Sequence, residues 1–516
     1  MSADVPTPVL PVGRPTECLP AIILIEDAPP TASVHSSIVT LVNSAIGAGI
    51  LALPYAFRCT GWAAGLATVF SLGSTQAYTL FVLSRHAEDA GSTTYGALVR
   101  KMLGKRASLA LCAVIVVFLF LACSAFLMLI GDTFHPILLQ AFGRAWWTSR
   151  NAAIVAVASC CILPLTFRSS LGALRAVSSL AVSAILLVVG AVVYGSVRIV
   201  NSPGYSWAGV RAFNPSAEFF GALPLIVLSF SCHTNVISVF SELEDPPDLR
   251  CTSCSGPVQQ QQQQQPPLES TGSSGYQSLP TPRLLAGRSM RRLKSSKLKS
   301  MVGVIAASIS LTASLYCVTG IAGYLAFAAD TKPDILLNFG SSDLLMQVAR
   351  ASIGLVITAS YPVIHFPARA AIRELLHHAT GDRFEDRWFA VAESVMWVGA
   401  TLGTSLACTD LAAMFQLIGG TCGGVLMLGV PGALLMQYSY SKHRDALKPL
   451  TFMNEPLLMP AAGEEGSKTG REPAQQPGPP GLLRSKLWWT GAVLQVMTVA
   501  LAVLTVLTVT GVLPSP

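Results

Sequence analysis

The chain has 516 residues, of which 52% are hydrophobic and only 12% are charged. Soluble proteins carry about 25% charged residues, so this composition excludes a water-soluble globular protein. Most of the 12 cysteines lie inside apolar runs, which excludes a secreted scaffold held together by disulfides. The formal net charge is +7, but the basic residues are scattered between apolar segments, which argues against a nucleic-acid partner. The composition is that of a protein embedded in a lipid bilayer.

Apolar windows of about 20 residues, long enough to cross about 30 Å of hydrocarbon, recur along the whole chain. They predict an all-α polytopic membrane protein with eleven transmembrane helices. In chain order we expect these helices at Ser33–Phe57, Trp62–Ser84, Ser108–Gly131, Asn151–Phe167, Ala176–Val200, Glu218–Ser241, Met301–Ala328, Leu344–Ala371, Trp388–Ala407, Leu411–Tyr438 and Leu487–Leu513.

Polar segments divide the predicted helices into groups. Residues 1–32, 242–300 and 439–486 are too rich in Pro, Gly, Ser, Gln or charge to bury a core, so we expect a disordered tail and two disordered loops. Helices one to six then occupy 33–241, helices seven to ten 301–438, and the eleventh, with a short outer tail, 487–516. Lys and Arg concentrate in the loops on the side of the N-terminus, which predicts that the N-terminus is cytoplasmic.

The first predicted helix contains residues that favour a break halfway across the membrane. Asn43-Ser-Ala-Ile-Gly47-Ala48-Gly49-Ile50 places an asparagine and two glycines at mid-span, and glycine is costly in a regular helix. Unwinding there would leave unpaired amides that suit a carboxylate, and free carbonyls that suit a small cation. The plainer interpretation is close packing of two helices through small residues.

The sixth predicted helix carries a polar cluster from Ser229 to Asn235 in an otherwise apolar stretch. Side-chain hydrogen bonds that compete with the helix would explain a break at this place. Interruptions in the first and the sixth helix are what two five-helix repeats would produce. Paired interruptions in corresponding positions are the best sequence indication of a transporter's binding site.

A few other polar side chains lie in or beside the predicted spans. Glu393 could reach the membrane surface or serve a proton-linked role, and His365 is expected to be a packed, hydrogen-bonded histidine. Asp132 and Asp410 are interpreted as solvated helix ends.

Several motifs together resemble a known family. Asn43 to Phe57 is similar to the first-helix motif of the amino acid/auxin permease family, in particular the sodium-coupled neutral amino acid transporters and their vacuolar relatives in plants, algae and fungi. Cys232 to Val236 followed by Glu242 to Pro246 is similar to the sixth-helix motif of the vacuolar group. Pro362 to Arg369 and Phe415 to Thr421 add to a resemblance that covers about residues 33 to 440.

The resemblance implies an inverted 5+5 repeat with broken helices one and six, plus one extra helix. It implies secondary active transport of L-amino acids by alternating access, as cation-coupled symport or antiport, through a monomeric transport unit. It implies no enzyme activity and no cofactor, with Na⁺ or H⁺ as the coupling ion. The substrate-binding residues it implies are Gly47, Ala48, Gly49, Ile50, Ser231, His233 and Asn235. The family's sodium site would map to Asn43, the carbonyl of Ile46, and Thr358 or Ser360.

Several alternatives stay open at this point. The hydroxyls of Thr358 and Ser360 could instead bond to their own helix, and His233 could bind a coupling proton. No charged residue sits firmly at the breaks, so a neutral amino acid is the expected substrate. An amino-acid-sensing transceptor fits the same features, whereas an enzyme would have only His377 and His378 as candidates. We expect the protein in a vacuolar or other endomembrane, or in the plasma membrane.

Overall fold

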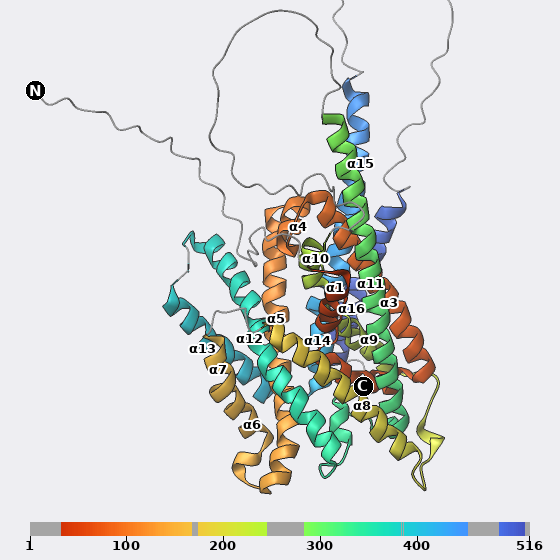
Figure 1. Cartoon of the computed structure of the whole chain (residues 1–516), viewed down its shortest axis with the longest axis vertical. Helices are drawn as coiled ribbons and strands as arrows, with labels where there is room; N and C mark the ends of the chain where they lie inside the picture. The colour runs from red at the N-terminus through yellow and green to blue at the C-terminus, as the bar shows by residue number, and fades with distance from the viewer. Residues whose placement is uncertain are drawn as a thin grey trace, which may run out of the picture.

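The computed structural model describes residues 32–167, 174–244, 283–382, 384, 386–452 and 485–510. Within these ranges the secondary structure is helical, apart from an isolated bridge that pairs Ala32 with Leu243. Helices such as α5 and α11 run along the long axis of the molecule, and α8 and α12 cross the bundle obliquely (Figure 1). The prediction of an all-α membrane protein with many spans is therefore confirmed.

Helical elements follow one another along the described residues. They are α1 (Val34–Ala45), η1 (Ala48–Ala52), α2 (Leu53–Thr60), α3 (Trp62–Ala90), α4 (Tyr95–Leu103), α5 (Lys105–Phe142), η2 (Trp146–Thr148), α6 (Arg150–Val157), η3 (Ala158–Ile162), α7 (Leu163–Thr166), α8 (Leu174–Val200), η5 (Trp207–Gly209), α9 (Glu218–Ser229), α10 (His233–Glu242), α11 (Arg283–Phe327), η7 (Ala328–Asp330), η8 (Ile335–Asn338), α12 (Leu344–Thr380), α13 (Arg387–Ala407), α14 (Leu411–Ile418), η9 (Gly419–Gly423), η10 (Val425–Gly429), α15 (Val430–Phe452) and α16 (Lys486–Val509).

The number of spans differs slightly from the predicted eleven. Among the described residues, nine helices are long and apolar enough to cross a membrane, or ten if the bent pair Val34–Ala45 and Gly49–Thr60 is counted as one span. The predicted fourth span corresponds to the shorter apolar helix Arg150–Thr166. Part of that helix is wound as a π-helix, over Ala158–Ile162, and the wider winding shortens the distance that a given number of residues covers.

Three helices differ from the sequence expectation in extent. Helix α4 was not predicted, because a nine-residue amphipathic helix is too short for a hydropathy window. Helix α11 begins at Arg283, ahead of the predicted Met301, and α15 continues past Tyr438 to Phe452. Most of the remaining residues of the predicted tail and loops lie outside the described residues.

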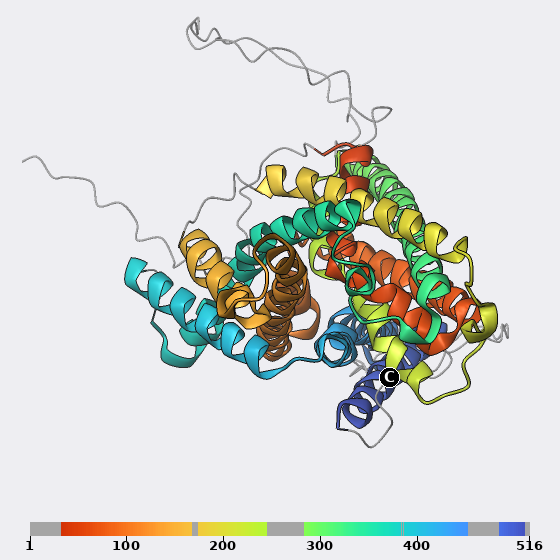
Figure 2. The same cartoon turned by 90° about the horizontal axis from the view of Figure 1, so that it is seen from below.

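The helices form two neighbouring groups. Helix α5 packs against α6, α12 and α13, and α11 packs against α1, α2 and α3. Viewed along the bundle, the two groups lie beside each other (Figure 2). We call the end of the bundle that carries α4, the start of α1 and the end of α10 the α4 face. The opposite end, which carries η8, is the η8 face.

A backbone bridge joins two helix ends at the α4 face. The amide of Ala32 donates to the carbonyl of Glu242 at 3.0 Å, and the amide of Glu244 donates to the carbonyl of Ala32 at 3.0 Å. Ala32 lies just before α1, and Glu242 is the last residue of α10. The first half of one interrupted helix is thus tied to the second half of the other.

A buried ion cluster links α12 to α13. The carboxylate of Glu393 accepts a hydrogen bond from Arg369 Nε at 2.8 Å and lies 2.8 Å from His365 Nε2. Arg369 also donates to the carbonyl of Thr166 at 3.1 Å and to the hydroxyl of Ser394. Glu393 therefore does not extend to the membrane surface, and His365 is the packed, hydrogen-bonded histidine that was expected. A buried charge needs such partners, because desolvation of a lone carboxylate costs several kcal/mol.

Of the two aspartates expected to be solvated helix ends, Asp410 is exposed as predicted and Asp132 is not. Asp132 forms an ion pair with Arg150 at 2.5 Å, and only 12% of its side chain is exposed, so the interpretation as a solvated end is wrong. Asp410 caps α14 by accepting from the amides of Ala412 and Ala413 at 2.9 and 3.1 Å. A carboxylate at a helix start satisfies amides that have no partner within the helix.

The tenth predicted span is packed closely through glycines. It passes through two π-helical segments, η9 and η10. A Cβ at Gly419 would lie 2.1 Å from the carbonyl oxygen of Pro224 in α9, and one at Gly420 would lie 1.6 Å from the Thr505 hydroxyl in α16. Hydrogen in place of a side chain is what lets these backbones approach.

We expect Gly419→Ala to destabilise the protein by about 1–3 kcal/mol, because the added methyl group meets backbone that cannot rotate away. The matched control is Gly399→Ala in α13, where a Cβ would meet no atom within 4 Å. Thermal unfolding of the purified protein measures both. Equal melting temperatures for the two variants would contradict the close approach of α9 and η9.

Candidate functional site

The first interrupted helix breaks where its glycines predicted. Helix α1 ends at Ala45, and Gly47 has extended backbone (φ −86°, ψ −157°) before η1 begins at Ala48. The two halves are bent by 55°. The first amides of a helix have no intrahelical partner, so the amides of Ala48 and Gly49 are available at the start of η1.

The second interruption separates α9 from α10. Helix α9 ends at Ser229, and α10 begins at His233 after the irregular residues Phe230 to Cys232. The Ser229 hydroxyl donates to the carbonyl of Leu225 at 2.9 Å. This is the competition between side chain and backbone that the polar cluster led us to expect.

Tyr316 of α11 joins the two interruptions. Its hydroxyl lies 2.9 Å from the carbonyl oxygen of Ala45 and also contacts the carbonyl of Ser229. One O–H donates to one carbonyl at a time, and Ala45 already accepts from the amide of Gly47 at 2.9 Å. The carbonyl of Ser229 therefore depends on Tyr316. A Cβ at Gly49 would lie 3.0 Å from Ser229 Oγ, so the two breaks are in direct contact.

A cavity of about 140 Å³ lies between the two interruptions. Its lining includes Gly47 and Gly49 and the three serines Ser44, Ser229 and Ser231. Apolar side chains form the rest of the wall, among them Phe118, Phe126, Ile364 and Phe415. No charged side chain lines the cavity among the described residues. The arrangement offers backbone amides to an anionic group and an uncharged surface to everything else.

A second cavity of about 260 Å³ adjoins the first, since Leu119 and Ile364 line both. It extends toward the α4 face, where Tyr95 of α4 contributes to its wall. One side is polar, from Thr234, Asn235 and Ser238 of α10.

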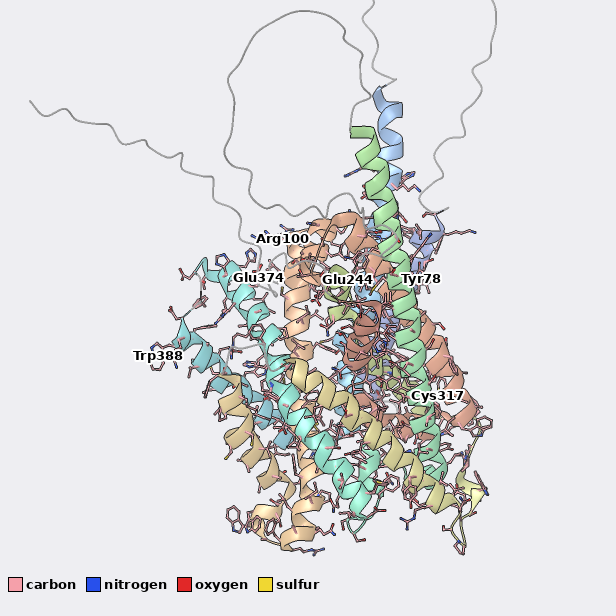
Figure 3. The ribbon with its side chains drawn as sticks, viewed as in Figure 1. Tyr78, Arg100, Glu244, Cys317, Glu374 and Trp388 are labelled. Atoms are coloured by element: carbon pink, nitrogen blue, oxygen red, sulfur yellow. The ribbon has the colours of Figure 1, made fainter. Side chains whose placement is uncertain are left out.

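Charged side chains surround the end of the bundle toward which this path leads. Arg100, Glu244 and Glu374 lie near the α4 face (Figure 3). The small cavity therefore adjoins a larger, polar-sided one that extends toward the charged end of the molecule.

The predicted substrate residues do not all lie on one cavity. Gly47, Gly49 and Ser231 line the small cavity, and Asn235 lines the larger one while donating to the Ser44 hydroxyl at 2.6 Å. Ile50 is fully buried in the core. Of Ala48, the structure describes the backbone at the start of η1.

His233 is placed on the side of α10 that faces α3. Its Nε2 lies 2.8 Å from the Thr79 hydroxyl, and that hydroxyl donates to the carbonyl of Gln76 at 2.9 Å. The Thr79 hydroxyl has two acceptors within reach, the carbonyl of Gln76 and His233 Nε2, so the tautomer of His233 decides which group donates in the His233–Thr79 bond. Nδ1 is buried without a partner among the described residues.

The four residues of the predicted ion site are not joined by hydrogen bonds within the described part of the chain. Thr358 donates to the carbonyl of Gly354 in its own helix at 2.7 Å. Asn43 is half-buried and Ile46 is buried. Both lie at the end of α1, beside the cavity residue Ser44, whereas Thr358 and Ser360 belong to α12.

Sequence reasoning missed Tyr316 and the aromatic wall of the cavity. Tyr316 lies in an apolar span that also contains Tyr324, and no sequence pattern distinguishes the two. Phe118 and Phe126 lie in an apolar span in which aromatic residues usually pack against neighbouring helices. Only the packing of α5 and α11 against the breaks identifies them.

The fold and site define a class of protein: a multi-span helical membrane protein with two interrupted helices around a small, uncharged cavity. Residues 30–256 and 288–453 match the family model described as transmembrane amino acid transporter protein. The chain therefore belongs to the transmembrane amino acid transporter family, and it is a transporter rather than an enzyme.

Relatives of known identity are similar over most of their length. Sodium-coupled neutral amino acid transporter 7 of Rattus norvegicus is 26% identical, with 82% of each chain covered. Vacuolar amino acid transporter 2 of Saccharomyces cerevisiae is 25% identical, covering 77% of this chain and 75% of that protein. Among solved structures, MhsT in complex with L-phenylalanine aligns with a TM-score of 0.49 and 11% identity, over 91% of this chain and 97% of that chain.

We expect Gly47→Leu to abolish substrate binding while the protein still folds. A Cβ at Gly47 meets nothing within 4 Å, so a leucine there would project into open space and fill the cavity. Thermal unfolding should stay near that of the wild type, and exchange of labelled amino acid should be lost. Normal exchange by a well-expressed variant would show that the substrate binds elsewhere.

We expect Tyr316→Phe to change the transport rate severalfold. The variant removes the donor on which the Ser229 carbonyl depends, and an unsatisfied buried carbonyl costs about 1–3 kcal/mol. That cost applies to the conformation in which the breaks touch. Initial exchange rates measure it, with Tyr194→Phe as control, since Tyr194 in α8 is 56% exposed. If both variants exchanged amino acid at the wild-type rate, the contact of Tyr316 with the two carbonyls would be unimportant for transport.

Proposed function

We propose that this amino acid transporter is a secondary active carrier of neutral L-amino acids that works by alternating access. The observation that supports it is the cavity between the two interrupted helices. The substrate carboxylate would bind the amides of Ala48 and Gly49, at the positive end of η1. The amino group would lie near the hydroxyl of Ser231 and the amide side chain of Asn235.

The cavity wall supports a neutral substrate. A charged substrate side chain would need an opposite charge in a site largely withdrawn from water, and the described lining residues provide none. The three serine hydroxyls suit a small or amide-bearing side chain, which they can reach by hydrogen bonds.

We propose a topology of eleven spans in a 5+5 inverted repeat plus one, with the N-terminus cytoplasmic. Arg150–Thr166 would be the short fourth span, and the pairs α1 with η1–α2 and α9 with α10 would open the two repeats. The α4 face would then be cytoplasmic, and the path from the cavity would make this structure the inward-facing state. The chain would reside in a vacuolar or other endomembrane, or in the plasma membrane.

We propose that a cation, Na⁺ or H⁺, drives transport as symport or antiport. The sodium version would use Asn43, the carbonyl of Ile46, and Thr358 or Ser360 after α1 and α12 approach. The proton version would use His233, but a second N–H at Nδ1 would find no acceptor among the described residues. Positive charge would also lie at the N-terminus of α10, where the helix dipole opposes it. These two arguments favour sodium.

Counterflow in proteoliposomes tests the proposal. Vesicles preloaded with unlabelled neutral amino acids should accumulate labelled glutamine or alanine transiently, and removal of sodium or a change of pH should alter the rate. Preloading with lysine or glutamate is the control for substrate class. The proposal fails if folded protein exchanges no neutral amino acid.

We expect Asn43→Ala to weaken coupling without impairing folding, because the substitution removes one oxygen ligand of the proposed sodium site. The apparent affinity for sodium should fall about tenfold or more, while exchange at saturating sodium persists. An unchanged sodium dependence would remove Asn43 from the site. Complete retention of uptake in sodium-free medium by the wild type would exclude the sodium version.

A further inference from the structure

The loop between α11 and α12 closes the η8 face over the first interrupted helix. Its helical turn η8 packs against η1 and α5, and a Cβ at Gly323 of α11 would lie 3.0 Å from Ile335 in that turn. Arg350 of α12 holds the loop in place by donating to the carbonyls of Leu336 and Phe339 at 2.7 and 2.8 Å. The loop therefore lies directly between the substrate-binding helix and the outside of this face.

Asp334 lies at the centre of that closure. It is 1% exposed. Its Oδ1 caps η8 by accepting from the amide of Leu336 at 2.9 Å. Its Oδ2 is buried and has no hydrogen-bond partner among the described residues. A buried carboxylate with a free oxygen is costly when ionised, because neither water nor a donor compensates its charge.

The neighbouring charges compensate Asp334 only in part, because the charge of Arg350 lowers the pKa of the carboxyl while that of Asp132 raises it. Arg350 is also buried, but it forms no ion pair with Asp334 within 4.0 Å among the described residues. Its guanidinium donates its hydrogen bonds to carbonyls of the loop instead. From α5 the nearby group is Asp132, which is itself paired with Arg150. Lys332, in the same loop, is exposed and donates to the carbonyl of Leu337 at 3.4 Å.

Two further elements, η1 and α11, lie against this turn. Residues Ala48–Ala52 of η1 are all Ala, Gly, Ile or Leu. Helix α11 presents Gly323 at the contact. Burial, and next the negative charge of Asp132, raise the pKa of Asp334 to about 7.

We propose that Asp334 is a proton-binding residue that stabilises the closed η8 face. In the closed face the carboxyl is dry and unpaired, so it binds a proton. Opening the face would hydrate the carboxyl and return it to ordinary acidity, so that the proton is released. Acid on this side of the membrane then favours closure, and neutral pH favours opening.

The direction of the effect follows from proton linkage. The carboxyl binds a proton more tightly in the closed face than in an open or unfolded chain, so closure is most favourable below the ordinary aspartate pKa. The extra stability of the closed face is lost as the pH rises toward about 7, the raised pKa of Asp334. A single proton changes the equilibrium at most about tenfold per pH unit.

Asp334→Asn tests this directly, since asparagine keeps the capping oxygen and imitates the protonated, uncharged carboxyl. The matched control is Asp343→Asn. Asp343 caps α12 in the same loop, but it is 31% exposed and paired with Arg198 at 3.6 Å. Thermal unfolding of the purified full chain between pH 4.5 and 8 is the first measurement, because it does not depend on transport.

We expect the melting temperature of the wild type and of Asp343→Asn to fall as pH rises toward 7, and that of Asp334→Asn to fall clearly less. The second measurement is exchange in proteoliposomes with only the pH at the η8 face varied. This exchange measurement rests on the proposed function. The exchange rate of Asp334→Asn should depend less on the pH at the η8 face than that of the wild type. Wild-type pH dependence of both properties in Asp334→Asn would overturn the proposal. Absence of exchange in all three proteins would count against the proposed function, while the unfolding curves would still decide the role of Asp334.

Discussion

The structure depends on two helices that stop in the middle of a membrane bundle. Each interruption frees backbone groups where water is scarce, and an unpaired group there costs several kcal/mol. Tyr316 lowers that cost, because its hydroxyl contacts the carbonyls of Ala45 and Ser229 at the two breaks and can donate a hydrogen bond to either one. In the proposed mode of binding, the amides of Ala48 and Gly49 would be satisfied by the substrate carboxylate. Stability of the breaks and substrate affinity would then be linked through the same backbone.

The helices around the breaks differ in how they resist deformation. Helices α12 and α13 are joined by the buried ion cluster of Glu393, Arg369 and His365, which permits few alternative arrangements. Contact between α9 and η9 rests on the close approach of backbones at Gly419. The first pair is held by directional bonds between charged groups and the second by shape alone, so the two pairs would respond differently to a movement of one group of helices against another.

Much of the fold was predictable, because hydropathy reports directly on membrane spans. The break in the first helix was predictable from Asn43, Gly47 and Gly49 together with the polar cluster in the sixth helix, since glycines alone also serve close helix packing, as at Gly419. Hydropathy could not detect α4, which is amphipathic and lies outside any span, nor the π-helical winding of Ala158–Ile162. The orientation of His233 toward Thr79 was also out of reach, because a residue's position in sequence does not say which side of a half-helix meets the cavity.

The bridge between Ala32 and Leu243 makes one mechanical unit of two half-helices. Helix α1 belongs to one interrupted span and α10 to the other, and Asn235 joins them a second time through Ser44. Separation of the two half-helices at this end would break both backbone hydrogen bonds of Ala32 and the bond between Asn235 and Ser44. The start of α1 and the end of α10 therefore move together, so a displacement of either half-helix displaces part of both interrupted spans.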